Sequence, residues 1–221
     1  MTGTDEAPWR LPAETEIGRV GLVVDDLAAC LEFYRDVVGL SVRSRSADRA
    51  TLGAGDEALL ELRHDPDAAP RGPTTAGLFH TAFRVPSRRD LADAVARIER
   101  SGRLDGASDH LVSEALYLSD PEDNGVEIYR DRPRSEWPRD GDGVAMDTLP
   151  LDLDALRSEA SEADRVPDGA TVGHVHLEVS SIPRSRSFYV DRLGFVPTQS
   201  MGDSALFVAA GGYHHHVGLN T

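Results

Sequence analysis

The 221-residue chain contains no lysine, so all 23 of its basic residues are arginines, and they stand against 38 acidic residues for a formal net charge of −15. This surplus of negative charge disfavours contact with nucleic acid and with anionic membranes, and we expect neither as a partner. Two explanations of the composition stay open. One is a GC-rich genome that favours arginine codons, and the other is a halophilic cytoplasm whose salt screens the self-repulsion of an acidic surface.

Cysteine and long apolar runs are also scarce. The single cysteine, Cys30, excludes an intrachain disulfide and a cysteine-rich metal site. No apolar run is long enough to span a bilayer, and the polar, acidic stretch Met1–Pro12 does not resemble a signal peptide. With an ordinary hydrophobic content of 40%, these absences predict a cytoplasmic globular protein.

What the sequence does contain is an internal repeat. The stretches Ile17–Val42 and Val172–Pro197 align without a gap at an offset of 155 residues. Each begins with an alternating apolar run typical of a strand, continues with helical spacing and leads into further short strands, which gives the order βαβββ. A more divergent copy lies between them, with a strand over 79–85, a helix over 89–101 and a closing hairpin across the turn at Asp120–Asn124.

Three βαβββ units therefore predict a mixed α+β fold. We expect an N-terminal tail at residues 1–16, two units within 17–130 and a third unit within 171–221. Residues 131–170 are rich in Asp, Pro, Gly and Ser, and they indicate an acidic connector that buries little apolar surface. A short helix is expected near 151–160.

Two of the eight histidines occupy matching places in different units. His80 and His174 lie on opening strands, each with an apolar residue three positions on and a valine five positions on. Either one alone is more typical of an ordinary strand residue than of a ligand. Their shared position favours a common role, since imidazole is a frequent metal ligand and proton carrier. Unit one has Arg19 at that position, and a guanidinium cannot ligate a cation.

A further group of polar residues lies in the hairpin of unit two. Its returning strand carries Glu127 between two apolar residues, and His110 and Tyr117 come earlier in the same segment. Turn chemistry explains the Asp-Pro and Asn-Gly pairs at the bend, but it does not explain a carboxylate flanked by Val126 and Ile128. A glutamate there could complete a metal site.

With these features the chain resembles the vicinal oxygen chelate superfamily of glyoxalases, bleomycin resistance proteins and extradiol dioxygenases. Segment 110–127 is similar to the signature of the extradiol ring-cleavage enzymes, although Ser108 and Asp123 depart from its usual residues. From Ile17 onwards the chain resembles the bacterial catechol 2,3-dioxygenases with four βαβββ units. The resemblance implies cupped half-barrel sheets. It also implies a fourth unit after Asn220, where the sequence ends, so we expect the third unit to be a truncated second domain.

The resemblance implies a metal site as well. His80, Glu127 and His174 would hold iron(II), with manganese(II) as an alternative, and would leave positions open for an aromatic diol and dioxygen. His110 and Tyr117 are expected to form hydrogen bonds with the substrate or to support the ligands.

Three consecutive histidines, at 214–216, are specific only by context: alone they indicate a polar strand edge or a fortuitous metal-binding tract with equal weight. The resemblance makes His215 the best candidate for the acid–base residue, with His216 on the opposite face. If the alternation is offset by one residue, His214 and His216 face the site instead.

The leading hypothesis is an extradiol dioxygenase that opens the ring of catechol or a substituted catechol. One alternative is a metal-dependent lyase or isomerase similar to glyoxalase, and another is a non-catalytic protein of the same fold that binds a small molecule. Because unit one lacks the fourth unit as a neighbour, we expect an open sheet edge there and a homo-oligomer.

Overall fold

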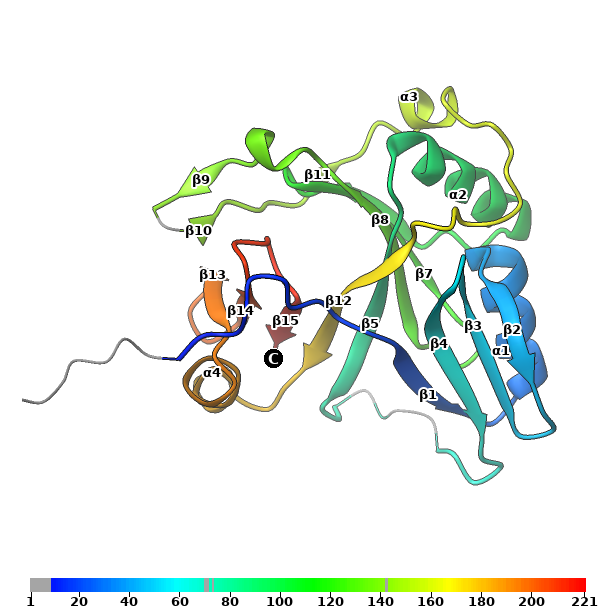
Figure 1. The fold of residues 1–221 in the computed structure, drawn as a ribbon, viewed down its shortest axis with the longest axis horizontal. Helices are drawn as coiled ribbons and strands as arrows, with labels where there is room; N and C mark the ends of the chain where they lie inside the picture. The colour runs from blue at the N-terminus through cyan, green and yellow to red at the C-terminus, as the bar shows by residue number, and fades with distance from the viewer. Residues whose placement is uncertain (1–8, 70–71, 73, 142) are drawn as a thin grey trace, which may run out of the picture.

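The computed structural model describes residues 9–69, 72, 74–141 and 143–221 (Figure 1). It contains the three predicted βαβββ units. Unit one comprises β1 (Val20–Val24), α1 (Leu27–Phe33) with a π-helical continuation (Tyr34–Val38), β2 (Ser41–Arg45), β3 (Arg49–Ala54) and β4 (Glu57–His64). Unit two comprises β5 (Gly77–Arg84), α2 (Arg88–Ser101), β6 (Gly106–Asp109), β7 (Ser113–Ser119) and β8 (Gly125–Asp131). Unit three comprises β12 (Thr171–Glu178), α4 (Ile182–Arg186) with a π-helical continuation (Ser187–Arg192), β13 (Val196–Ser200), β14 (Ala205–Ala209) and β15 (Val217–Asn220).

All three units share one strand order, in which the first strand pairs in parallel with the last. Unit one forms a separate four-stranded sheet, β1-β4-β3-β2. Units two and three join through antiparallel pairing of β5 with β12 into one nine-stranded sheet, β11-β6-β7-β8-β5-β12-β15-β14-β13, and Figure 1 shows these two strands side by side near the middle of the molecule. The two opening strands that carry the matching histidines are therefore neighbours.

Helix α2 illustrates how local sequence sets an element. The Ser87 side chain accepts from the Asp90 backbone N–H while the Asp90 carboxylate accepts from the Ser87 N–H, which completes a capping box. Gly102 ends the helix in the left-handed region at φ 67°. The inner face is formed by three fully buried side chains, Leu91, Val95 and Ile98.

One large core joins unit one, unit two and part of the connector, and a smaller core lies within unit three. Arg97 of α2 holds the larger one together: its guanidinium donates to the carbonyl oxygens of Val38 (3.2 Å) and Ala163 (2.8 Å). Burial lowers the pKa of Arg97 to about 10, so the side chain stays charged at neutral pH. Gly39 leaves room for it, because a Cβ there would lie 2.8 Å from Arg97 Nε.

The connector departs from the expectation that it buries little apolar surface. It contains a 3-10 turn (Arg134–Glu136), β9 (Arg139–Asp140), β10 (Gly143–Val144), β11 (Leu149–Pro150) and, as predicted, a short helix, α3 (Leu153–Arg157). Strand β11 extends the nine-stranded sheet by pairing with β6. Five apolar side chains of the connector are buried: Trp137, Val144, Leu156, Val166 and Ala170. The composition misleads because these few residues are spaced so that each reaches a core.

The N-terminal tail contacts unit three, and the sheet of unit one has a free edge. Of the predicted tail, residues 1–8 lie outside the described residues, whereas the Leu11 N–H donates to the Gly194 oxygen of unit three at 3.0 Å. Among the described strands β1 pairs only with β4, so the expected open edge is present. Within the described part of the chain no helix has the length and apolar character to cross a membrane. The domain limits, a homo-oligomer and a cytoplasmic location stay predictions.

Candidate metal centre

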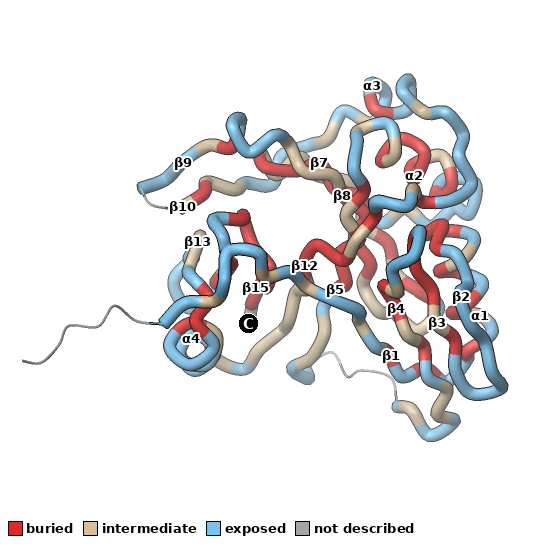
Figure 2. The backbone as a smooth tube through the Cα atoms, viewed as in Figure 1, coloured by how far each residue is buried: buried red, intermediate tan, exposed pale blue. Residues whose placement is uncertain are grey.

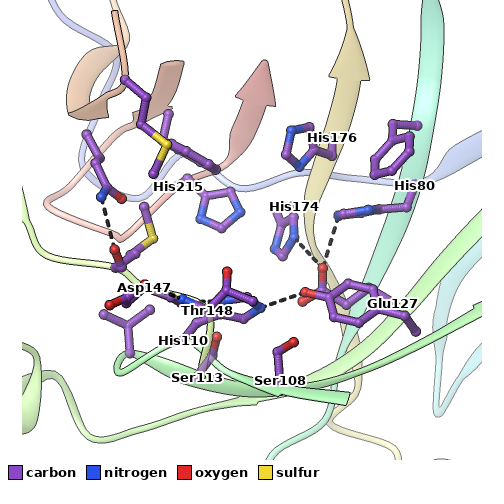
Figure 3. A pocket seen from close by; sticks show the side chains of 17 residues that line it. His80, Ser108, His110, Ser113, Glu127, Asp147, Thr148, His174, His176 and His215 are labelled. Carbon is purple, nitrogen blue, oxygen red and sulfur yellow. Dashed lines mark hydrogen bonds and ion pairs between the residues drawn. The ribbon is translucent and has the colours of Figure 1, made fainter. Parts of the chain in front are cut away.

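Three buried polar side chains converge at the centre of the nine-stranded sheet (Figure 3). His80 comes from β5, Glu127 from β8 and His174 from β12. His80 Nε2 lies 3.0 Å and His174 Nε2 3.1 Å from the same Glu127 Oε2, and the ligand atoms of all three lie within 4.8 Å of one another. The three residues expected to hold a metal are thus brought together.

Strand pairing explains this convergence. Parallel pairing of β5 with β8 sets Ala82 beside Glu127, and antiparallel pairing of β5 with β12 sets Ala82 beside His174. Cross-strand neighbours share a face, and so does His80, two residues before Ala82 on the same strand. Figure 2 shows that buried residues line these three strands where they cross the middle of the fold.

The site holds its side chains in the protonation states that a metal requires. Burial favours the neutral acid at Glu127, but His174 and His80 outweigh burial and hold the pKa of this carboxyl well below its usual range. Burial lowers the pKa of His174, so its ring is neutral at neutral pH. A carboxylate and a neutral imidazole both offer lone pairs.

The donor set fits a divalent cation. His80 Nε2 is buried and, although it lies close to Glu127, it makes no hydrogen bond with any described residue. A buried ring nitrogen that makes no hydrogen bond is costly, and a cation between the two imidazoles and the carboxylate would give it a partner. Two nitrogen ligands and one carboxylate on one face suit iron(II) or manganese(II) and leave coordination positions open.

The three residues form one wall of a cavity of about 310 Å³, a volume at the lower end for small-molecule sites. Its apolar lining consists of Phe79, Val112, Met146, Met201 and Phe207. The connector segment 146–148 contributes to this lining. The sequence analysis gave the connector no part in the site, and its composition carries no signal for one.

His110 and Tyr117 lie at the cavity as a hydrogen-bonded pair. His110 Nδ1 is 2.7 Å from the Asp147 carbonyl oxygen, which can only accept, so Nδ1 carries the hydrogen. The other ring nitrogen, Nε2, lies 2.7 Å from the Tyr117 hydroxyl and accepts from it when the ring is neutral. Burial and the neighbouring Glu127 raise the pKa of Tyr117, so the phenol keeps its proton. Both residues thus line the cavity, and their role toward the substrate stays a prediction.

The three consecutive histidines lie before the closing strand of unit three, not on it, which corrects the sequence-based placement. Strand β15 begins at Val217, and the preceding turn contains Gly211 and Gly212 at positive φ. Two adjacent glycines in the left-handed region form a turn here, and extended strand geometry resumes only at Val217. His215 lines the cavity, with its ring centroid 4.1 Å from that of His174.

The two flanking histidines point elsewhere. His214 is fully buried, and its Nε2 donates to Asp131 Oδ1 at 2.9 Å. His216 Nδ1 accepts from the Ala210 N–H at 3.2 Å, behind the cavity. Of the two orientations left open by the sequence, the structure therefore has the one in which His215 faces the site.

His176 also lines the cavity, although the sequence analysis gave it no role. Burial lowers its pKa to about 3, so the ring is neutral. The ring lies against Gly218, where a Cβ would approach His176 Nδ1 to 2.9 Å. Gly218 pairs with His176 as Glu127 pairs with Ala82, so unit three has a glycine where unit two has its carboxylate. The shared face with His174 was the available signal.

A curled mixed sheet of repeated βαβββ units, with two imidazoles and a carboxylate gathered in a small-molecule cavity, defines a protein of the vicinal oxygen chelate class. Residues 16–128 match the Glyoxalase/Bleomycin resistance protein/Dioxygenase superfamily. The chain is 44% identical over 214 residues to catechol-2,3-dioxygenase of Bacillus subtilis (strain 168), which covers 94% of this chain and 75% of the relative. The chain belongs to this superfamily, as its motifs predicted.

Two further comparisons agree. The chain is 31% identical over 114 residues to biphenyl-2,3-diol 1,2-dioxygenase 3 of Rhodococcus globerulus, which covers 50% of this chain and 60% of the relative. The crystal structure of a proposed dioxygenase from Bacillus subtilis has a TM-score of 0.61 at 12% identity, over 93% of this chain and 63% of that one. The second comparison bears on the fold alone and confirms its predicted class.

Proposed function

We propose that the protein is an extradiol dioxygenase, which opens the ring of catechol or a substituted catechol beside the diol with dioxygen as co-substrate. The observation that carries this proposal is the convergence of His80, Glu127 and His174 on the wall of one cavity. The relatives support it, since both are named as dioxygenases of aromatic diols.

The metal proposed for the site is iron(II), with manganese(II) as the alternative. Its proposed ligands are His80, Glu127 and His174. When bound, such a metal supplies one centre at which both diol oxygens and dioxygen can bind and exchange electron density.

The cavity walls supply orientation. Phe79 and Phe207 offer aromatic surface to a planar ring, and Met146 and Met201 fit around it because thioether side chains adapt to irregular shapes. A diol held against these walls would present its oxygens toward the His–Glu–His group.

Proton transfer is assigned to His215. Burial and the neighbouring histidines keep the pKa of His215 well below its usual range, so the ring is neutral and can accept a proton. We assign it the proton of one diol hydroxyl, which it returns to an oxygen atom of the substrate later in the reaction. Tyr117 keeps its proton and donates a hydrogen bond to His110, so its hydroxyl oxygen is left to accept a hydrogen bond from the bound diol.

The test is purification without oxygen in high salt, metal analysis, and addition of catechol in air. We expect bound iron and a coloured ring-opened semialdehyde, and we expect the His80→Ala variant to give neither. Absence of both iron and colour in the wild-type protein would refute the proposal. Turnover of a glutathione hemithioacetal without catechol cleavage would indicate a glyoxalase-like enzyme instead.

A further inference from the structure

A line of hydrogen-bonded side chains leads from His215 away from the cavity. His215 Nδ1 lies 2.7 Å from His214 Nδ1, and His214 Nε2 lies 2.9 Å from Asp131 Oδ1. His214 is fully buried, whereas the Asp131 side chain is 21% exposed. The line therefore runs from the cavity to the edge of the solvent, and the proposed function assigns no role to its outer two members.

Asp131 is a fixed negative end for this line. Besides His214, its carboxylate accepts from the Tyr213 hydroxyl at 3.0 Å and lies 3.5 Å from Arg84 Nη1. Burial favours the neutral acid, but the hydrogen bonds from His214 and Tyr213 and the charge of Arg84 outweigh it and hold the pKa of Asp131 below its usual range. An ionised carboxylate only accepts, so the hydrogen between Asp131 and His214 belongs to His214 Nε2.

That hydrogen determines the next one along. When the His214 ring carries one hydrogen, that hydrogen lies on Nε2, and its bare Nδ1 can only accept. The 2.7 Å contact between the two Nδ1 atoms then requires His215 Nδ1 to be the donor. His215 Nε2 is left without a hydrogen, and it is the ring nitrogen that the line does not occupy.

The strand that begins this line also carries a metal ligand. Asp131 lies four residues after Glu127 on β8, and residues four apart on a strand share a face. The line and the ligand group are therefore fixed to one rigid element of unit two, although His215 belongs to unit three. A change at Asp131 or His214 can reach His215 without moving the ligands.

We propose that Asp131 and His214 are positioning residues that hold His215 in the tautomer with hydrogen on Nδ1 and a bare Nε2 directed at the substrate. The proposal rests on the proposed function, in which His215 accepts a proton from the diol. A histidine tautomer is set by the hydrogen bond that its other nitrogen makes, and a ring with hydrogen on Nε2 cannot accept a proton there. Without His214 the neutral His215 ring could adopt either tautomer, and only the one with hydrogen on Nδ1 could accept a proton at Nε2.

Two variants at one position separate the two contacts of His214. In His214→Asn the amide oxygen occupies the place of Nδ1 and can still accept from His215, while the contact with Asp131 is lost. In His214→Gln the amide nitrogen occupies the place of Nε2 and can still donate to Asp131, while the acceptor for His215 is lost. Both replace one buried ring with an amide, so each is the structural control of the other.

The readout is the tautomer of His215 in the full chain labelled with ¹⁵N-histidine and loaded with zinc(II), a diamagnetic metal, by long-range ¹H–¹⁵N correlation. The His215→Gln variant identifies the signal. We expect hydrogen on Nδ1 in the wild-type protein and in His214→Asn, and hydrogen on Nε2 in a large fraction of His214→Gln. In the iron-loaded protein we expect kcat to fall about 100-fold in His214→Gln and less than about 10-fold in His214→Asn, with KM for catechol nearly unchanged.

Hydrogen on Nε2 of His215 in the wild-type protein would overturn the proposal, and this result needs no variant to fold. Equal losses of kcat in both variants with unchanged tautomers would also overturn it. If the protein cleaves no catechol, the proposed function fails, whereas the tautomer spectrum still decides the role of Asp131 and His214.

Discussion

Unit one and unit two place a glutamate at the same register position and use it differently. On the last strand of unit two, Glu127 lies opposite Ala82, two residues after His80. On the last strand of unit one, Glu61 lies opposite Gly21, two residues after Arg19, so each glutamate lies near the residue at the ligand position. In unit one, Arg19 Nη1 lies 3.3 Å from Glu61 Oε2, and the two side chains are 49% and 24% exposed. In unit two, the corresponding side chains are 8% and 4% exposed.

The difference arises from what covers each pair. Strand β5 of unit two is paired with β12 of unit three, which adds His174 and removes water, whereas β1 has no second neighbour among the described strands. An exposed ion pair in high dielectric contributes little, while a buried carboxylate next to two imidazoles must be matched by charge. The candidate metal site thus lies where two βαβββ units pair, and not within the exposed sheet of unit one.

The largest effect is expected from removal of a ligand in the paired units. Glu127→Ala and His174→Ala each remove one of three metal ligands, and we expect affinity for iron(II) to fall by more than about 100-fold, since loss of residues that merely support ligands costs 10–100-fold. Metal content after gel filtration measures this. Retention of stoichiometric iron by either variant would refute the assigned site.

A second experiment introduces a histidine at the corresponding position of unit one. Arg19→His recreates the His–Glu pair of unit two without a covering unit, and we expect no additional bound metal, because two exposed ligands do not form a closed site. A second equivalent of iron in this variant would show that coverage by another unit is unnecessary, and the comparison would then fail.

A smaller effect concerns acid. Burial lowers the folded-state pKa of His216 to about 4 from an ordinary value near 6.5, so the unfolded chain binds more protons and stability is lost as pH falls from about 6.5 to 4. In His216→Asn an amide oxygen can replace Nδ1 as acceptor for the Ala210 N–H but does not titrate. Between about pH 6.5 and 4 the free energy of unfolding should fall in both proteins. We expect this fall to be about 1–2 kcal/mol smaller in His216→Asn than in the wild-type protein. Chemical denaturation at several pH values measures this; identical slopes would contradict it.

A change in the exposed pair of unit one should matter less. Arg19→Ala removes a surface ion pair and leaves Glu61 with Arg49, whose Nη1 lies 3.2 Å from it. We expect the free energy of unfolding to change by less than about 1 kcal/mol and iron content to stay the same. Thermal unfolding with metal analysis tests both, and a loss of metal would tie unit one to the site.

The smallest effect is expected at Cys30 in the core of unit one. Burial and the nearby carboxylates of Asp120 and Glu122 raise the pKa of this thiol far above neutral, so no thiolate is available for reaction. We expect no modification by iodoacetamide in the native protein at pH 8 and full modification after unfolding, read by mass spectrometry. Fast native labelling would show that unit one opens readily.

Much of this arrangement is predictable from sequence because it repeats. The 155-residue offset identifies two units, and the shared setting of His80 and His174 points to the third unit and to the candidate ligand positions. The expected edges of strands and helices differ from the observed ones by a few residues. Strand β6 was missed because its sequence, Gly-Ala-Ser-Asp, lacks apolar alternation and is fixed by its neighbours β7 and β11.

Other features depend on contacts between distant segments and have no local signal. The pairing of β5 with β12 joins strands about ninety residues apart, and the bond from His214 to Asp131 spans 83 residues. Strand alternation predicted that His215 faces the cavity, and it does. The reason given was wrong, because His215 precedes the strand, which begins at Val217. The chain reversal at Gly211 and Gly212 supplies the orientation instead.

Gly218 has a consequence for charge balance. Because unit three has this glycine where unit two has Glu127, and the His176 ring fills the space, the candidate ligand group holds a single carboxylate beside its imidazoles. A divalent ion bound through that carboxylate and neutral imidazoles would keep one positive charge uncompensated. A diol that has lost one proton cancels that charge, whereas a second carboxylate would have cancelled it beforehand. The absence of a side chain at position 218 would thus leave to the proposed substrate the one negative charge that the centre lacks.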